Sequence, residues 1–240
     1  MTTQSLTFPV AAGRKFSIAL SVFVAAVVVA GFWPTYFGPL LAGIVDKPWF
    51  IHFHATVYSG WVLVFMTQVF LAATGRLALH RKFGEIAIYY GYTIIAVGVF
   101  TAFAMFASRV QAGNITEGQA RLLAPLTDMI VFPVFFLLAV RYRHRPELHK
   151  RLMLVAMTAL LVAAALRMRF LGELLPLNTR TLIWLSPILL AMAYDGIAKR
   201  IVHPVYVIGL AALYVLSLRR FLSGTDTWLA ISGWLANLFA

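Results

Sequence analysis

The sequence predicts an all-α protein, a polytopic transmembrane bundle of seven helices that forms a single integral membrane domain over residues 1–240. Of the 240 residues, 62% are hydrophobic and only 12% are charged, whereas a soluble chain carries about 25% charged residues. The mean hydropathy is +0.87. The apolar residues also form runs of the ~20 residues that a spanning helix needs. This composition excludes a disordered protein, a disulfide-stapled secreted module and an ordinary cytosolic enzyme.

The expected spans, in chain order, cover residues 16–38, 50–73, 86–108, 125–141, 152–171, 181–198 and 202–219. The first follows a basic pair and ends at an aromatic anchor, residues 33–36, with no small-x-small cleavage site after it, so we expect an uncleaved span rather than a secretory signal. The second to seventh are separated by short polar or basic connections. The fourth is the shortest, and Pro125 and Pro133 interrupt it. The apolar tail, residues 221–240, is too interrupted for another span, and we expect it to lie at the membrane interface.

The distribution of lysine and arginine sets the orientation of the bundle. If the N-terminus lies on one side, that side collects twelve Lys and Arg residues and the other side collects eight. We therefore expect the N-terminus in the cytoplasm, the C-terminal segment outside and the chain in a bacterial inner (plasma) membrane. The basic residues occur in short clusters between apolar runs, which suits anionic lipid headgroups as partners and does not suit nucleic acid.

One face of the second span is polar and aromatic. His54, Tyr58, Trp61, Phe65 and Gln68 recur at steps of three and four residues, the period of one helical face. We expect this face to point into the bundle, because polar side chains are costly against lipid. Two interpretations stay open, namely hydrogen bonding with aromatic packing between helices, or the wall of a quinone, cofactor or lipid cavity.

Two charged residues are expected near the outer side of the membrane, on the side from which His54 enters its span. Asp128 lies one turn into the fourth span, and Arg167 lies near the outer end of the fifth. An unpaired charge is costly at either place, so we expect the two to pair, with His54 nearby. Such a cluster is either a structural ion pair or a site that clamps a ligand or handles protons. The predicted cofactor-binding set is His54, Tyr58, Trp61, Gln68, Asp128 and Arg167.

The cytoplasmic side holds the denser group of histidines. His80 precedes the third span, His149 opens the fifth, Asp195 ends the sixth and His203 opens the seventh. Three imidazoles and a carboxylate are an acceptable ligand set for zinc or non-haem iron. Two imidazoles from different helix ends can instead be the axial ligands of a haem. The neighbouring cations favour a third interpretation, the binding of phosphate or lipid headgroups.

The sequence lacks the residues that several other kinds of functional site require. The chain contains no cysteine, which excludes disulfides, iron–sulfur ligation, thiol catalysis and c-type haem attachment. No glycine-rich nucleotide-binding loop and no GxSxG nucleophile motif occurs.

The motifs resemble those of uncharacterised bacterial multipass membrane proteins. The shared features are a His that opens a span, a Trp and a Gln within it, a His-Arg-x-x-Gly turn, a His-Lys-Arg-Leu-Met entry to a later span and a closing His-Pro. Here they correspond to His54, Trp61, Gln68 and residues 80–84, 149–153 and 203–204. The likeness covers about residues 50–205 and implies a multi-pass membrane fold, with no assigned activity.

The chain is also similar to cytochrome b561-type haem proteins, in which a span opens with His, a Trp follows and another His precedes the next helix. His54, Trp61 and His80 match this pattern. That family carries one histidine pair on each side of the membrane. No histidine of another span is available on the outer side here, so the resemblance implies at most one haem, held by His80 with His149 or His203.

Three functions stay open. The first is a membrane-embedded redox or metal-cofactor protein, in which His80, His149 and His203 bind haem b or a single zinc or iron ion and Asp195 supports them. The second is a zinc-dependent membrane hydrolase, in which metal-bound water attacks a lipid ester or amide. The third is a non-catalytic assembly or scaffold subunit.

Overall fold

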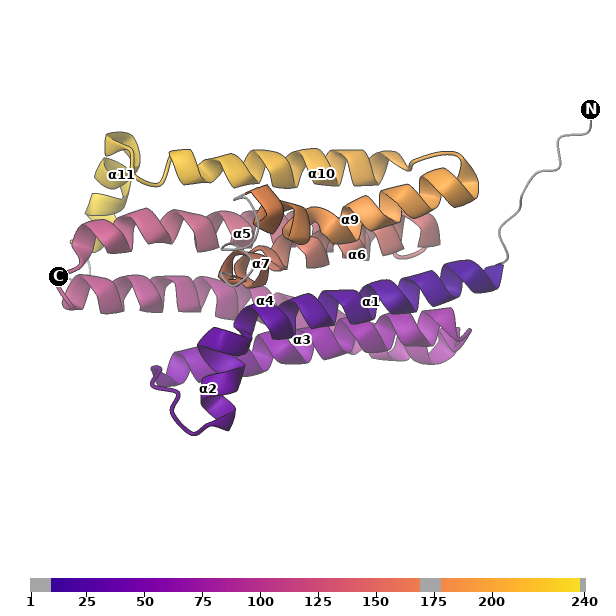
Figure 1. Cartoon of the computed structure of the whole chain (residues 1–240), viewed down its shortest axis with the longest axis horizontal. Coiled ribbons are helices and arrows are strands. Elements are labelled where there is room, and N and C mark those ends of the chain that lie inside the picture. Colours follow the sequence, from indigo (N-terminus) through magenta and orange to yellow (C-terminus); the bar gives the residue numbers. More distant parts are fainter. Residues whose placement is uncertain (1–9, 169–177, 238–240) are drawn as a thin grey trace, which may run out of the picture.

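The computed structural model describes residues 10–168 and 178–237, which form helices joined by short turns and loops. Within these ranges there is no strand, and seven helices are long and apolar enough to span a membrane (Figure 1). The spans are Ala12–Leu41, Trp49–Ala73, Leu77–Gln111, Ile115–Arg141, Pro146–Arg167, Thr179–Lys199 and Pro204–Phe221. The predicted fold class is confirmed, and the chain is a multi-pass integral membrane protein.

The helices run back and forth between two ends of the bundle. In chain order they are α1 (Val10–Phe32), a π-helical turn (Trp33–Phe37), α2 (Gly38–Leu41), α3 (Trp49–Ala73), α4 (Leu77–Gln111), α5 (Ile115–Arg141), α6 (Pro146–Leu160), α7 (Val162–Arg167), α9 (Asn178–Lys199), α10 (Pro204–Ser217), a 3₁₀ turn (Leu218–Phe221) and α11 (Asp226–Ala236). The start of α1 and the α3–α4, α5–α6 and α9–α10 connections gather at one end, here called the basic end (Figure 1). The other end carries α2 and α11 and is called the α11 end.

The third and fourth spans begin nine and ten residues earlier than the sequence predicts. α4 begins at Leu77 and α5 at Ile115, because Gly75 and Gly113 turn the chain sharply with φ of 78° and 79°. Glycine adopts this left-handed conformation at little cost, so the next helix starts at once. Pro125 and Pro133 lie inside α5, which stays helical through both. The basic segment before the predicted third span is therefore a helical extension.

The fifth span is the central one. In its most apolar stretch 67% of the residues are buried, against 22–39% in the other spans. It consists of two helices, α6 and α7, with a break at Leu161. There the Thr158 carbonyl accepts a hydrogen bond from the Trp184 indole N–H of α9 at 2.8 Å. Part of the predicted span, residues 169–171, lies outside the described residues.

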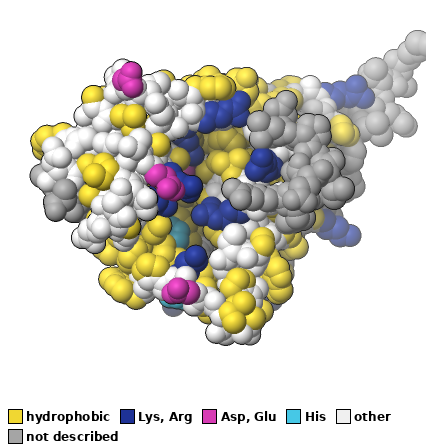
Figure 2. All heavy atoms as spheres, turned by 60° about the vertical axis from the view of Figure 1, so that its left-hand side comes forward, with side chains coloured by type: hydrophobic (Ala, Val, Ile, Leu, Met, Phe, Trp, Pro, Cys, Tyr) yellow, Lys and Arg dark blue, Asp and Glu magenta, His cyan; other side chains and the backbone are white. Residues whose placement is uncertain are grey.

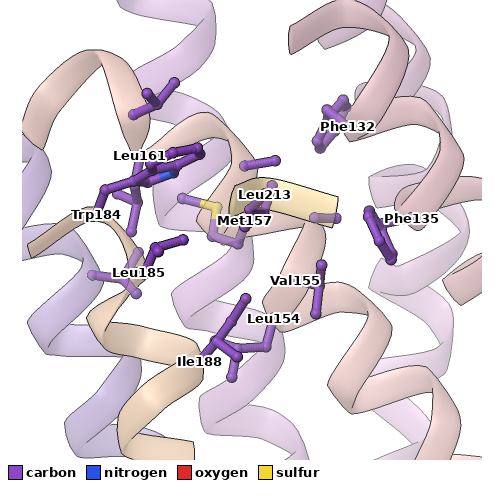
Figure 3. Packing of buried hydrophobic residues seen from close by; sticks show 14 of the residues in the cluster. Phe132, Phe135, Leu154, Val155, Met157, Leu161, Trp184, Leu185, Ile188 and Leu213 are labelled. Carbon is purple, nitrogen blue, oxygen red and sulfur yellow. The ribbon is translucent and has the colours of Figure 1, made fainter. Parts of the chain in front are cut away.

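The core forms around this central span. Small residues of α6, among them Ala156 and Ala159, have no exposed surface and let the neighbouring helices approach. Larger side chains of the same span and of α5, α9 and α10 fill the space around them (Figure 3). The labelled ones are Phe132, Phe135, Leu154, Val155, Met157, Leu161, Trp184, Leu185, Ile188 and Leu213. Many large apolar side chains of the outer helix faces are exposed, as expected where lipid is the solvent.

The C-terminal segment forms α11, which lies across the end of the bundle (Figure 1). The Trp228 indole N–H donates to the Gln119 carbonyl of α5 at 2.7 Å, and the Gln119 amide donates to the Leu229 carbonyl at 3.2 Å. α11 is therefore fastened to α5. Its position at a membrane interface stays a prediction.

Candidate functional site

The structure brings two of the predicted histidines together at the basic end. His80 lies in the first turn of α4 and His149 in the first turn of α6. Their ring centroids are 6.3 Å apart, and the ring planes are inclined at 78°. These helices are separated in the chain by the whole of α5, so the fold itself creates the pair.

A main-chain carbonyl orients each ring. Nδ1 of His80 lies 3.2 Å from the Gln68 carbonyl of α3, and Nδ1 of His149 lies 2.9 Å from the Ala139 carbonyl of α5. A carbonyl only accepts hydrogen bonds, so each Nδ1 carries the hydrogen and each neutral Nε2 keeps its lone pair. This is the tautomer that metal-ligating histidines use, with the second nitrogen held by a hydrogen bond.

The other two predicted metal ligands have different partners. Oδ2 of Asp195 lies 2.6 Å from Nη2 of Arg151, and Oδ1 lies 3.2 Å from Nζ of Lys199. His203 caps α10, since its Nδ1 accepts a hydrogen bond from the Val205 N–H at 3.2 Å. Burial lowers the pKa of His203, and the charge of Arg151 lowers it further. The neutral imidazole that the cap requires is thereby favoured.

The four-residue metal site expected from His80, His149, Asp195 and His203 is not formed. Among residues 10–168 and 178–237, no group of three or more His, Asp or Glu side chains is arranged to hold a metal ion. The physical reason is competition, because the Arg151 guanidinium takes the carboxylate that the sequence assigns to a metal. The histidine pair is what remains of the predicted site.

Arg151 is the residue whose role the sequence reasoning missed. Its side chain is 2% exposed and joins three helices. The guanidinium donates hydrogen bonds at 2.6 Å to Asp195 of α9 and to Glu147 of its own helix, α6, and it lies 5.4 Å from the centre of the Tyr206 ring of α10. A signal was present in the sequence. Arg151 lies four residues before the buried Val155, on the inward face of the span, so it needed a buried acidic partner.

The polar face of α3 points inward, as predicted. Trp61 is 2% exposed and Phe65 is 7% exposed, while His54, Tyr58 and Gln68 are partly buried. The His54 and Tyr58 rings stack at 4.0 Å, and the Tyr58 hydroxyl donates to the Ile94 carbonyl at 3.0 Å. Two buried nitrogens of this face, Nδ1 of His54 and Nε1 of Trp61, have no hydrogen-bond partner.

The expected pairing of Asp128 with Arg167 is wrong. Oδ1 of Asp128 lies 2.6 Å from Nη1 of Arg219, which follows α10 and also donates to Thr127. Arg167 donates instead to the Ala163 carbonyl at 2.8 Å, and its guanidinium lies 4.9 Å from the centre of the Phe32 ring. The sequence could not show that the end of α10, rather than the end of α7, lies beside α5.

Two grooves open on the outer surface between helices. One, between α3 and α4, has a volume of about 200 Å³ and is lined by Leu63, Val64, Thr67, Gln68, Phe83, Ile86, Ala87 and Tyr90. Gln68 thus lines this groove with its side chain while its carbonyl holds His80. The other, between α9 and α10, has a volume of about 400 Å³ and an apolar lining. Of the predicted cofactor-binding residues, Gln68 lines the α3–α4 groove, and the linings of these two grooves include no other member of the set.

The chain was compared with protein-family models, curated proteins and solved structures. No family model, no curated protein and no solved structure is significantly similar to it.

Proposed function

We propose that the protein binds one haem b between His80 and His149 at the basic end of the bundle and carries electrons within a bacterial inner membrane. The observation that supports this most strongly is the histidine pair itself. Both rings are fixed through Nδ1 by main-chain carbonyls, which leaves both Nε2 atoms free as ligands.

The residues fit a haem better than they fit a lone zinc ion. Two imidazoles on opposite sides of one metal have ring centres roughly 6.4 Å apart, because a metal–imidazole bond is about 2.0–2.1 Å long. The observed separation is 6.3 Å. A haem iron needs two protein ligands, because the porphyrin supplies the other four nitrogens. Zinc needs three or four protein ligands, and the described residues offer no such group.

The surroundings of the pair suit a cofactor with an apolar body and acidic edges. The α3–α4 groove beside His80 is mostly apolar, and it opens next to Gln68. Exposed basic side chains lie on the same helix end, including Arg81 and Lys82 of α4. Such cations bind carboxylates through charge-assisted hydrogen bonds.

A bound haem iron would supply reversible uptake of one electron, from a reduced donor to an oxidised acceptor. His80 and His149 would hold it, and their Nδ1 hydrogen bonds would keep the rings from rotating and raise the basicity of both Nε2 atoms. The buried α6 core beneath the pair would exclude water. With the basic end in the cytoplasm, as the positive-inside rule predicts, electrons would be exchanged near the inner leaflet.

The test is the absorption spectrum and haem content of the full-length protein, purified in an uncharged detergent from haem-sufficient cells. We expect the spectrum of a six-coordinate low-spin haem and about one haem per chain. His80→Ala and His149→Ala should each remove the low-spin spectrum. His144→Ala is the matched control, since His144 is exposed in the same α5–α6 connection and should leave the spectrum unchanged.

A colourless wild-type protein from such cells contradicts the proposal. It is also contradicted if both histidine variants keep the wild-type spectrum. A colourless, metal-free protein whose histidine variants fold normally would instead support the scaffold hypothesis.

A further inference from the structure

Two arginines lie next to each other at the α11 end, far from the histidine pair. Arg167 is the last residue of α7 and is exposed, and Arg180 lies in the first turn of α9. Nη1 of Arg180 is 3.5 Å from the carbonyl oxygen of Leu166, the residue that precedes Arg167. The Arg180 side chain therefore reaches the end of α7, at the residue next to Arg167.

Two of the acidic side chains described at this end pair with other arginines. Asp128 pairs with Arg219 at 2.6 Å, and Glu117 pairs with Arg121 at 2.7 Å. Within residues 10–168 and 178–237, Arg167 and Arg180 have no carboxylate partner. An anion placed near both guanidinium groups would gain favourable Coulomb energy from each.

Polar atoms without partners lie in the same region. Nε of Arg180 and Nδ1 of His54 are both buried and make no hydrogen bond. His54 is close enough to Arg167 for the two side chains to interact electrostatically. A buried polar group without a hydrogen-bond partner destabilises the fold, because it has lost its hydrogen bonds to water and gained none within the protein. Groups from α3, α7 and α9 thus combine positive charge with unused hydrogen-bonding capacity.

The end of α7 packs closely against α1. Gly31 of α1 packs directly on the Ala164 main chain of α7, where an added Cβ would lie 2.2 Å from the Ala164 carbonyl oxygen. This contact fixes α7, and hence Arg167, against α1. Figure 2, with the α11 end turned forward, shows several Lys and Arg side chains on this face of the molecule.

We propose that Arg167 and Arg180, with His54 beside them, bind a phosphate group at the α11 end. Arginine guanidinium groups bind phosphate oxygens through paired, charge-assisted hydrogen bonds. A phosphate monoester carries about −1.5 to −2 charges at neutral pH, which matches two guanidinium groups, whereas a carboxylate matches one. The site lies at the end of the spans, at the depth of lipid headgroups. The phosphate belongs either to a lipid or to a soluble molecule.

The experiment measures binding to the full-length protein with two probes. Native mass spectrometry compares protein in nanodiscs of phosphatidylcholine alone with protein in nanodiscs that also contain phosphatidic acid, which carries a phosphate monoester. Calorimetry in an uncharged detergent measures the binding of inorganic phosphate. Saturable retention of phosphatidic acid without phosphate binding indicates a lipid source, and phosphate binding indicates a soluble one. Either result supports the site.

Arg167→Gln and Arg180→Gln should each weaken binding of the positive probe by about tenfold to a hundredfold, the loss expected for one hydrogen bond to a charged group. Arg220→Gln is the matched control, because Arg220 is an exposed arginine of the same end that lies over the Phe221 ring. It removes the same charge and should leave binding within about twofold. If Arg167→Gln fails to fold, as judged by circular dichroism, the loss of binding in Arg180→Gln alone tests the proposal.

Binding of neither probe by the wild-type protein overturns the proposal. An equal loss in Arg220→Gln also overturns it, because the attraction would then come from net charge rather than from this site. Neither result depends on the histidine pair, so the haem proposal stands or fails independently.

Discussion

The buried ion pair between Arg151 and Asp195 should dominate the stability of the basic end. The side chains of Arg151 and Asp195 are 2% and 6% exposed, and Oδ2 of Asp195 accepts two hydrogen bonds from the guanidinium at 2.6 and 3.2 Å. Asp195→Ala leaves the Arg151 charge buried, with the exposed Glu147 as its remaining acid. Removing one partner of a buried pair costs about 3–5 kcal/mol. We expect a loss of that size in the free energy of unfolding.

The assay is equilibrium unfolding in mixed micelles, followed by circular dichroism and tryptophan fluorescence as the fraction of denaturing detergent rises. Glu147→Gln is the control on the same network. The side chain of Glu147 is 60% exposed, so its ion pairs should contribute less than about 1 kcal/mol. The double variant Arg151→Leu/Asp195→Leu should recover most of the stability lost in Asp195→Ala, because apolar side chains often replace a buried pair without net cost.

A loss of less than about 1 kcal/mol in Asp195→Ala would refute this reasoning, since it would mean that water reaches the guanidinium. Equal losses in Asp195→Ala and Glu147→Gln would refute it as well.

Three further predictions concern helix contacts. Gly31→Ala should destabilise the fold by about 1–3 kcal/mol, because the added Cβ would lie 2.2 Å from the α7 backbone. Gly224→Ala is the control and should not destabilise the fold, because its Cβ would meet nothing within 4 Å. Thermal unfolding of the two variants measures the difference. Because burial and the Arg151 charge lower the pKa of His203, unfolded chains bind the proton first, so stability should fall as the pH drops below about 6.5. His203→Asn, which caps α10 without titrating, should reduce that slope in unfolding measured from pH 8 to about pH 5. Trp228→Phe removes the indole bond to α5 at 2.7 Å, so limited proteolysis should cut the α11 segment faster by about fivefold, as loss of about 1 kcal/mol implies.

The spans followed from the sequence because membrane thickness sets the length of an apolar run. Their boundaries did not, because charged residues such as Arg81 and Lys82 continue α4 beyond the apolar region. Hydropathy detects where lipid contact ends, and it does not detect where helical hydrogen bonding ends. The sequence also predicted that Pro125 and Pro133 interrupt the fourth span. In the structure both lie within one continuous helix, α5.

The candidate site was only partly predictable. The number of spans between His80, His149, Asp195 and His203 predicts that all four residues lie at the same end of the bundle. Which side chains touch depends on the lateral order of the helices, and the sequence does not state that order. In the structure Arg151 of α6 pairs with Asp195 of α9, and His149 of α6 lies beside His80 of α4.

The most direct test of the central claim is electron paramagnetic resonance of the oxidised, full-length protein. Imidazole planes inclined at 78° should give the strongly anisotropic low-spin ferric signal of near-perpendicular axial histidines, and His149→Ala should abolish it. A rhombic low-spin signal typical of parallel imidazoles would contradict the geometry of the pair. The absence of any low-spin ferric signal from protein made in haem-sufficient cells would contradict haem ligation by His80 and His149.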